Sequence, residues 1–432
     1  MPTQSKRSFS RHFLALCCAL ALAGCGGGAG SGGTGTTPPV GPTGPAAGTE
    51  FLYQVSYSDL AGYITVSSFD PSSGAVGALN NVTGQFVPLG LNPMVPPSAK
   101  YIYGFGQPEY EKEQGIYCAS ITGAAGQLTP IAEPYLPANP FAQITSARMD
   151  GLGRFIYVED VSPNETTSAI RSFAINPEDG SLTEGPATTQ QSSGGNALIA
   201  GTDPAGKYVY TWSGTATGTA TGTGWVLQAY AIDGTDGSLT QVPGSPYVLF
   251  ASPDPGVSIA DPLGLAVDPS GRFVYVPMVG TGADQVNFSE TLVFSVDPDT
   301  GALAPVTGSP FSLPNFQGTG PVALDPNGKV LYVVGLNNAA ATGIGAYPVD
   351  PTSGNITGAL PFTLVTHCCE AIMMDPAGEN LVAFESQPQI DLGYDYVPSI
   401  YTFTVDQTTG ALGVEQTTAG GAGLSGVIIK IP

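Results

Sequence analysis

The chain has 432 residues, of which 12 are Lys or Arg and 34 are Asp or Glu, so its formal net charge is −22. This charge repels phosphate backbones and argues against a nucleic-acid partner. The 59 glycines and 39 prolines weaken helix interiors and exclude a mainly helical protein. A hydrophobic content of 42% is too high for a disordered chain.

The N-terminus has the pattern of an export signal. Three basic residues, Lys6, Arg7 and Arg11, precede an apolar run at 13–23, which is too short to span a bilayer and typical of a signal-peptide core. The run ends in Leu22-Ala23-Gly24-Cys25, which resembles the lipobox of bacterial lipoproteins. The resemblance implies cleavage after Gly24 and lipid attachment at Cys25. An ordinary secretory signal followed by a chance cysteine is the alternative.

The segment after Cys25 has the composition of a tether. Residues 26–49 contain ten Gly, four Pro and no charged residue, so they cannot form a core. We therefore expect a signal peptide at 1–24, a lipidated tether at 25–49 and a globular domain at 50–432. Because Gly26 rather than Asp follows the cysteine, the resemblance implies a bacterial outer membrane. An acidic surface gains nothing from anionic lipid, so the lipid itself must hold the protein there.

Two alternating turn motifs set the architecture. Most copies of the first read Asp or Asn, often Pro, two further residues and Gly, and its glycines recur every 52 to 64 residues. The seven glycines are Gly74, Gly126, Gly180, Gly237, Gly301, Gly354 and Gly410. The second motif reads Asp-Pro-x-Gly, or a variant of it, before Lys or Arg and an aromatic and β-branched strand, as at Asp268–Val276. In both motifs Asp caps the turn and Gly supplies the left-handed position.

Each period therefore holds four short strands, two tight hairpins and two longer loops, which is typical of a β-propeller blade. The pattern predicts an all-β, seven-bladed β-propeller with four antiparallel strands per blade. The second motif occurs six times, and the copy before Phe51 is missing. The apolar segment at 426–431 has no partner after it. We expect it to become the innermost strand of the blade that begins at Phe51, which closes the ring and removes the sheet edges.

The repeated sequences resemble the lactonase-type seven-bladed propeller family, which includes 6-phosphogluconolactonases and a muconate-lactonising cyclase. The resemblance covers about residues 50–432 and rests on Asp268–Val276, Val296–Leu303, and the segments Gly244–Tyr247 and Gly308–Phe311. These residues belong to turns and strands, so they are specific for the fold and carry no catalytic information. The family implies His, Arg and Glu in the propeller funnel. Several inner strands here begin instead at Leu198, Leu263 or Gly320.

Charges that break the repeat gather in blade three. Arg148 interrupts its apolar inner strand, Arg171 is in its third strand, and Glu159, Asp160 and Glu165 follow its second. An arginine near a carboxylate in a funnel suits an anionic lactone or a developing oxyanion. An Arg–Asp or Arg–Glu pair that closes the blade is the alternative.

His367 is the one histidine beyond the signal, and its side chain alone has an unperturbed pKa suited to general base catalysis near neutral pH. It heads the run His367-Cys368-Cys369-Glu370, whose members are too close in sequence to converge well on a metal. We therefore expect no metal site, and a structural role for His367 is the alternative. Cys118, Cys368 and Cys369 cannot all pair, and we expect mostly buried free thiols.

Function should concentrate on the face that carries the variable 2–3 and 4–1 loops, opposite the tight turns. Aromatic and acidic residues occur together there, and exposed aromatics suit sugars or peptides. The candidate ligand-binding residues are Asp160, Tyr110, Trp212, Tyr394 and Tyr396. Our main expectation is a membrane-anchored, non-enzymatic propeller that binds a protein, glycan or small ligand, without a cofactor and as a monomer.

The alternative is a hydrolase of a lactone or cyclic ester. Its candidate catalytic residues are Arg148, Glu159, Arg171, His367 and Glu370.

Overall fold

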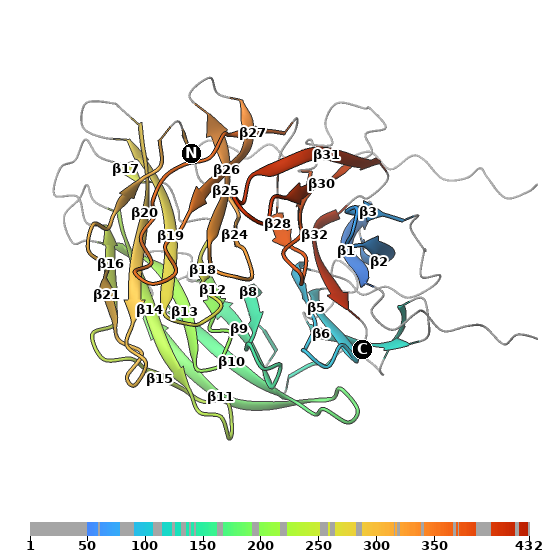
Figure 1. Ribbon diagram of the computed structural model, residues 1–432. Coiled ribbons are helices and arrows are strands. Elements are labelled where there is room, and N and C mark those ends of the chain that lie inside the picture. Colours follow the sequence, from blue (N-terminus) through green and yellow to red (C-terminus); the bar gives the residue numbers. More distant parts are fainter. Residues whose placement is uncertain are drawn as a thin grey trace, which may run out of the picture. The chain divides into compact units, whose positions relative to one another are not determined.

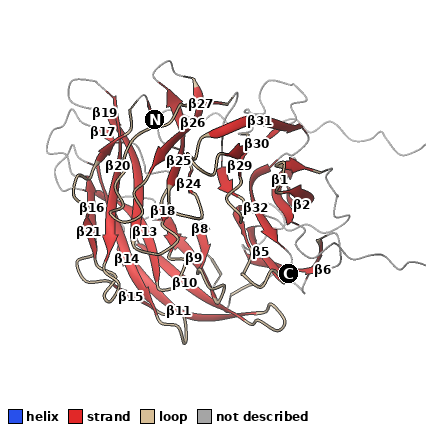
Figure 2. Cartoon of the chain, viewed as in Figure 1, coloured by secondary structure: helices blue, strands red, loops and turns tan. Residues whose placement is uncertain are grey.

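The computed structural model describes residues 50–58, 61–77, 90–106, 115–122, 126–130, 135–137, 140–141, 144–161, 167–191, 198–216, 223–250, 258–259, 264–281, 287–314, 316–317, 320–337, 341–365, 369, 371–385, 399–419 and 423–430. All of them belong to the unit Gly44–Pro432, one of two into which the chain divides. Their regular structure consists of β-strands (Figure 2). Among these residues there is no helix with the length and apolarity needed to span a membrane.

The strands form seven antiparallel sheets, one for each predicted blade (Figure 1). From the inner strand outward, blade one is β32 (Gly423–Lys430), β1 (Glu50–Ser58), β2 (Ala61–Asp70) and β3 (Ala75–Val76). Blade two is β4 (Gly90–Met94), β5 (Tyr101–Gly106), β6 (Gly115–Thr122) and β7 (Gln127–Pro130). Blade three is β8 (Ile144–Met149), β9 (Phe155–Val161), β10 (Thr167–Ile175) and β11 (Leu182–Gln191).

In blades four to six, some strands are interrupted, so two short segments share one partner. Blade four is β12 (Leu198–Thr202), β13 (Tyr208–Ala216), β14 (Thr223–Ile232), and β15 (Leu239–Gln241) with β16 (Tyr247–Phe250). Blade five is β17 (Ser258–Ile259) with β18 (Ala266–Val267), β19 (Phe273–Thr281), β20 (Asn287–Val296), and β21 (Leu303–Pro305) with β22 (Phe311–Ser312). Blade six is β23 (Phe316–Gln317) with β24 (Val322–Leu324), β25 (Val330–Asn337), β26 (Thr342–Pro348) and β27 (Thr363–Leu364). Blade seven is β28 (Ala371–Met374), β29 (Asn380–Phe384), β30 (Ser399–Val405) and β31 (Leu412–Ala419).

The predicted ring closure is confirmed. β32, the last of the described strands, pairs antiparallel with β1. In this register Tyr53 lies opposite Val427 and Glu50 lies opposite Lys430. The inner strands then contact one another in a circle, in the order β4, β8, β12, β18, β24, β28, β32 and back to β4. The free edges of these strands therefore border a central channel.

The tight turns are built as the motifs predict. In the turn between β18 and β19, the buried Asp268 carboxylate accepts hydrogen bonds from the backbone N–H groups of Arg272 (2.5 Å) and Phe273 (2.8 Å). Asp150 accepts the same two bonds from Arg154 and Phe155 in blade three. Much of the acidity of the chain thus serves local backbone structure rather than a partner.

Neighbouring blades are joined by one repeated contact between a side chain, in most blades an aromatic ring, and a glycine. A residue at the start of each second strand lies against the glycine in the turn between the third and fourth strands of the next blade. A Cβ atom added at Gly180 would lie 2.8 Å from the Tyr101 ring, and one added at Gly237 would lie 2.6 Å from the Phe155 ring. The remaining pairs are Phe51 with Gly126, Tyr208 with Gly301, Phe273 with Gly354, Val330 with Gly410 and Asn380 with Gly74.

Buried tyrosines strengthen this junction in several blades. The Tyr53 hydroxyl donates to the Gly126 carbonyl at 2.8 Å, and the Tyr103 hydroxyl donates to the Gly180 carbonyl at 3.0 Å. Tyr332 donates in the same way to Gly410 at 2.8 Å. The turns at Gly126 and Gly180 thus receive a ring contact on the glycine and a hydrogen bond on its carbonyl from the preceding blade. The turn at Gly410 receives a contact from Val330 and the hydrogen bond from Tyr332.

The junction predicts that Gly237→Ala destabilises the propeller. Gly237 has a φ of 75°, so an alanine there would be strained in a left-handed conformation, and its methyl group would collide with the Phe155 ring. We expect the free energy of unfolding to fall by about 2–4 kcal/mol in urea titrations. The matched control is Gly358→Ala, because no atom lies within 4 Å of a Cβ there. Equal unfolding midpoints for the two variants would contradict the proposed role of the junction.

Candidate functional site

Arg148 lies in the inner strand β8 of blade three, which borders the central channel. Its guanidinium donates a hydrogen bond to the Ala147 carbonyl at 2.8 Å. Within the part of the chain that the structure describes, no carboxylate forms an ion pair with it. Burial lowers the pKa of Arg148 from its ordinary value because the protein takes the place of hydrating water around the charge. A partly exposed cation without a counter-ion is suited to receive an anion.

Arg171, on the third strand of the same blade, is instead fully engaged. Its guanidinium contacts Glu184 at 2.5 Å and Asp160 at 3.2 Å, and its Cζ lies 4.5 Å from the centroid of the Phe141 ring. The side chain is 6% exposed. Of the two alternatives for the blade-three arginines, Arg171 fits the ion pair and Arg148 does not. Asp160, which we expected to bind a ligand, is one of the two partners of Arg171.

Glu159 is a buried carboxylate with unsatisfied oxygens. It is 0% exposed, and among the described residues neither oxygen forms a hydrogen bond, although the Ser168 hydroxyl lies close enough to favour its charge. Burial raises the pKa of Glu159 to about 7; the neighbouring Ser168 hydroxyl opposes the rise and the Asp160 charge adds to it. Because no substrate could touch so buried a group in this structure, Glu159 is not a reachable catalytic residue here.

Polar side chains from two blades enclose Glu159. Blade three contributes Ser146, Ser168 and Gln190, and blade four contributes Thr211 and Gln228, all of them at most 7% exposed. These residues carry no distinctive sequence signal, because Ser, Thr and Gln are common in strands and the five lie far apart along the chain.

The structure buries Trp212, which we expected to bind a ligand. Its side chain is 4% exposed and belongs to the core between blades four and five, together with Tyr210 and Met278. It therefore has no surface to offer a ligand. The other predicted site residues, His367, Glu370, Tyr110, Tyr394, Tyr396 and the lipid-attachment residue Cys25, lie outside the described residues.

The structure agrees with the expected free thiol at Cys118 and differs from the expectation at Cys369. Cys118 is free, and burial raises the pKa of its thiol to about 12, so it is not a reactive thiolate near neutral pH. Cys369 is disulfide-bonded, which makes the expectation wrong for this residue. Among the residues that the structure describes, no group of three or more His, Cys, Asp or Glu is placed to hold a metal ion.

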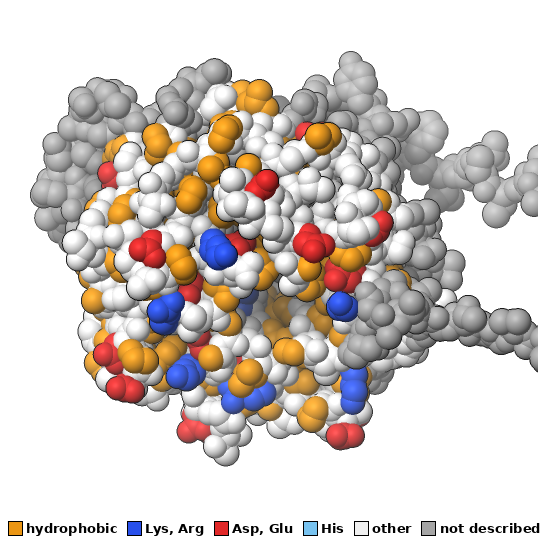
Figure 3. Space-filling view, in the orientation of Figure 1, with side chains coloured by type: hydrophobic (Ala, Val, Ile, Leu, Met, Phe, Trp, Pro, Cys, Tyr) orange, Lys and Arg blue, Asp and Glu red, His pale blue; other side chains and the backbone are white. Residues whose placement is uncertain are grey.

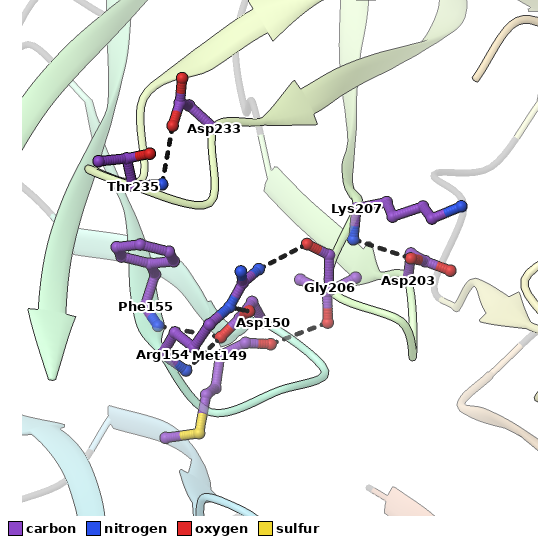
Figure 4. Close-up of polar contacts among 10 residues, drawn as sticks. Met149, Asp150, Arg154, Phe155, Asp203, Gly206, Lys207, Asp233 and Thr235 are labelled. Carbon is purple, nitrogen blue, oxygen red and sulfur yellow. Dashed lines mark hydrogen bonds and ion pairs between the residues drawn. The ribbon is translucent and has the colours of Figure 1, made fainter. Parts of the chain in front are cut away.

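The tight-turn face carries a cavity of about 380 Å³ lined by residues of blades three, four and five, including Arg154, Lys207 and Asp299. Arg154 is already occupied there. Its Nε contacts Asp150 at 2.9 Å and its Nη2 donates to the Gly206 carbonyl at 2.8 Å (Figure 4). The side chain thus braces blades three and four. The face seen in Figure 3 is hollowed near its centre, with Lys and Arg side chains spaced around the hollow.

Glu159 predicts an unusual pH dependence of stability. A carboxyl group whose folded pKa of about 7 lies above its unfolded value of 4.5 keeps its proton in the folded state after the unfolded chain has lost it. Stability is therefore greatest below pH 4.5 as far as this group is concerned, and it is lost as the pH rises to about 7. The loss should be about 3 kcal/mol. In Glu159→Gln, urea unfolding measured from pH 4.5 to 8 should lack this decline, whereas parallel curves for the two proteins would contradict the buried charge.

A protein-family model described as "Lactonase, 7-bladed beta-propeller" matches residues 102–420. No curated protein matches the chain significantly. Among solved structures, the Pseudomonas aeruginosa periplasmic gluconolactonase is 16% identical, with a TM-score of 0.65 over 89% of this chain and 99% of that one. A Bacteroides uniformis protein assigned as a 6-phosphogluconolactonase is 17% identical, with a TM-score of 0.61 over 89% and 100% of the two chains. Its counterpart from Bacteroides fragilis is 16% identical, with a TM-score of 0.56 over 90% and 100%.

At identities of 16–17%, the solved structures show that this chain shares their fold. The family model shows that the chain is related to the lactonase family. The match overturns our main expectation of a non-enzymatic binding propeller, because the family is one of lactonases, and it favours the hydrolase alternative. The geometry of the turns, the seven blades and the matched residues agree on one conclusion. The chain belongs to the seven-bladed β-propeller lactonase family.

Proposed function

We propose that the protein hydrolyses a lactone of the sugar-acid type, with Arg148 as a residue that binds the reacting group. The observation that supports this most directly is an unpaired arginine on the channel wall of a lactonase-family propeller. The similarity to a periplasmic gluconolactonase supports an aldonolactone as the substrate class. The export signal is consistent with a substrate outside the cytoplasm.

Hydrolysis of a lactone requires that the negative charge on the carbonyl oxygen be stabilised in the transition state. Water adds to the lactone carbonyl, the ring C–O bond breaks, and the product is a hydroxy acid that releases a proton at neutral pH. Negative charge develops on the carbonyl oxygen in the transition state, and a fixed cation in a poorly hydrated channel stabilises it more than water does. Arg148 offers planar N–H donors that suit both this oxygen and the product carboxylate.

His367 and Glu370 are the candidates for the base that activates the water. An imidazole is suited to this role near neutral pH.

The test is hydrolysis of glucono-δ-lactone by the purified mature protein, followed by acid release in a pH-stat against the uncatalysed rate. Arg148→Ala should lower kcat/KM by about 10²–10³-fold, the usual effect of removing one group that stabilises an oxyanion. Arg272→Ala is the matched control, because it removes an exposed arginine from the tight-turn face. Wild-type rates in Arg148→Ala would remove the residue from the site. Lack of hydrolysis across a panel of lactones by the wild-type protein would overturn the proposed activity.

We also propose that the protein is lipid-anchored at Cys25 and faces the periplasm or the cell surface from the outer membrane. The lipobox resemblance and the uncharged tether support this proposal. Cells that express the Cys25→Ser protein should incorporate no labelled palmitate into it, and the protein should move from the membrane fraction to the soluble fraction. Unchanged membrane retention of the variant would argue for another means of attachment.

A further inference from the structure

We infer that Glu159 is a positioning residue for Arg148, and that loss of its proton draws the arginine out of the channel into an ion pair between blades three and four. The inference rests on the proposed function for its effect on activity. The geometry of the pair stands independently of that function.

The first step is that both side chains share one face of blade three. In the β8–β9 ladder, Arg148 is opposite Tyr157, and Ser146 is opposite Glu159. Opposite residues of an antiparallel pair project to the same face, so all four side chains share it. That face is turned toward blade four. Tyr157 packs with Ile199 and Val209, and the Ser146 hydroxyl accepts a 2.7 Å hydrogen bond from the Ile199 N–H.

The second step is that the two charges are within reach of each other but are not paired. Arg148 and Glu159 are diagonal neighbours across the ladder, a relation that places Cα atoms about 7–8 Å apart and lets long side chains meet. Arg148 instead folds back onto the Ala147 carbonyl at the free edge of β8. Glu159 points into the blade interface with both oxygens unsatisfied. This diagonal relation lets a change of the arginine rotamer bring its guanidinium toward Glu159.

The third step is that Glu159 has little competing stabilisation among the described residues: the Ser168 hydroxyl, which has no other partner, is the neighbouring group that favours its charge. The amides around it are engaged elsewhere, since Gln190 donates to Thr211 at 3.3 Å and Gln228 donates to Ser213 at 3.2 Å. The Tyr230 hydroxyl donates to Gln228 at 2.7 Å. Tyr157 and Tyr230 are the titratable groups that face Glu159 from its own blade and from β14, and burial raises the pKa of both, so they stay neutral. Asp160, Arg171 and Glu184 form their ion pairs on the other face of the blade.

The consequence is an arginine whose position depends on one proton. With Glu159 neutral, the guanidinium stays at the channel edge and is available to an anion. With Glu159 ionised, a buried carboxylate without a partner is costly, and Arg148 is the cation that can neutralise it. Pairing removes the charge that the substrate needs, so the affinity for the lactone falls as the pH rises through the titration of Glu159.

The pair is tested directly by nuclear magnetic resonance of the mature protein with ¹³C-labelled glutamate side chains. The Glu159 carboxyl signal, assigned from its loss in Glu159→Gln, should titrate with a midpoint about one pH unit higher in Arg148→Gln than in the wild type, because an adjacent cation favours the carboxylate. Arg272→Ala should leave the midpoint unchanged. Equal midpoints in the wild type and Arg148→Gln, or no titration between pH 5 and 9, would overturn the inference.

The kinetic arm uses glucono-δ-lactone between pH 5.5 and 8. The wild-type KM should rise about tenfold as Glu159 ionises, whereas kcat changes less. In Glu159→Gln, which keeps a neutral side chain of the same size, KM should stay at its low-pH value. If the protein lacks lactonase activity, the proposed function is refuted. The NMR titration of Glu159 then tests by itself whether Arg148 and Glu159 form an ion pair. An active protein whose KM rises equally in both forms would refute the positioning role alone.

Discussion

The contact between a residue at the start of each second strand and a turn glycine of the next blade is the constraint on which the rest of the structure depends. A sheet of four strands buries little on its own, so each blade is stable only through its neighbours. The contact fixes how closely blades approach, because the missing Cβ of the glycine is the space that the ring of Phe155 or Tyr101 fills. It recurs around the whole circle, from Phe51 on Gly126 to Asn380 on Gly74.

Within this regular frame, blade three is the exception that creates chemistry. Other blades place apolar side chains where blade three places Arg148 and Glu159. The frame holds these charges because the repeated junctions, and not the residues around the charges, supply the packing. Two charged groups on one face then remain separate, while a third, Arg171, is neutralised on the other face by Asp160 and Glu184. The same blade therefore carries the ion pairs of Arg171 on one face, and on the other face Arg148 and Glu159, which are not paired with each other in this structure.

The sequence predicted the turns, the seven blades, the number of strands and the closure by the last strand, because each depends on local chemistry repeated at a fixed period. It also singled out blade three, since charges in an apolar repeat are visible without a structure. It could not tell Arg148 from Arg171, because the difference lies in which side of a sheet each faces and in partners such as Glu184 that are distant along the chain. Trp212 was misjudged for a similar reason: a strand extended beyond the point where a loop was expected, and the ring entered the core.

The expectation of a non-enzymatic function was wrong for a different reason. The expectation of a binding protein relied on aromatic and acidic residues assigned to loops, whereas the family relationship is carried by turns and strands. Residues that are informative about ancestry need not be those that act on a ligand.

The pairing of β32 with β1 has a consequence for how the protein is made. Blade one lacks its innermost strand until the last segment of the chain has been synthesised, so the ring stays open throughout translation. The two partners are separated by almost the whole sequence, and such long-range pairing is slow.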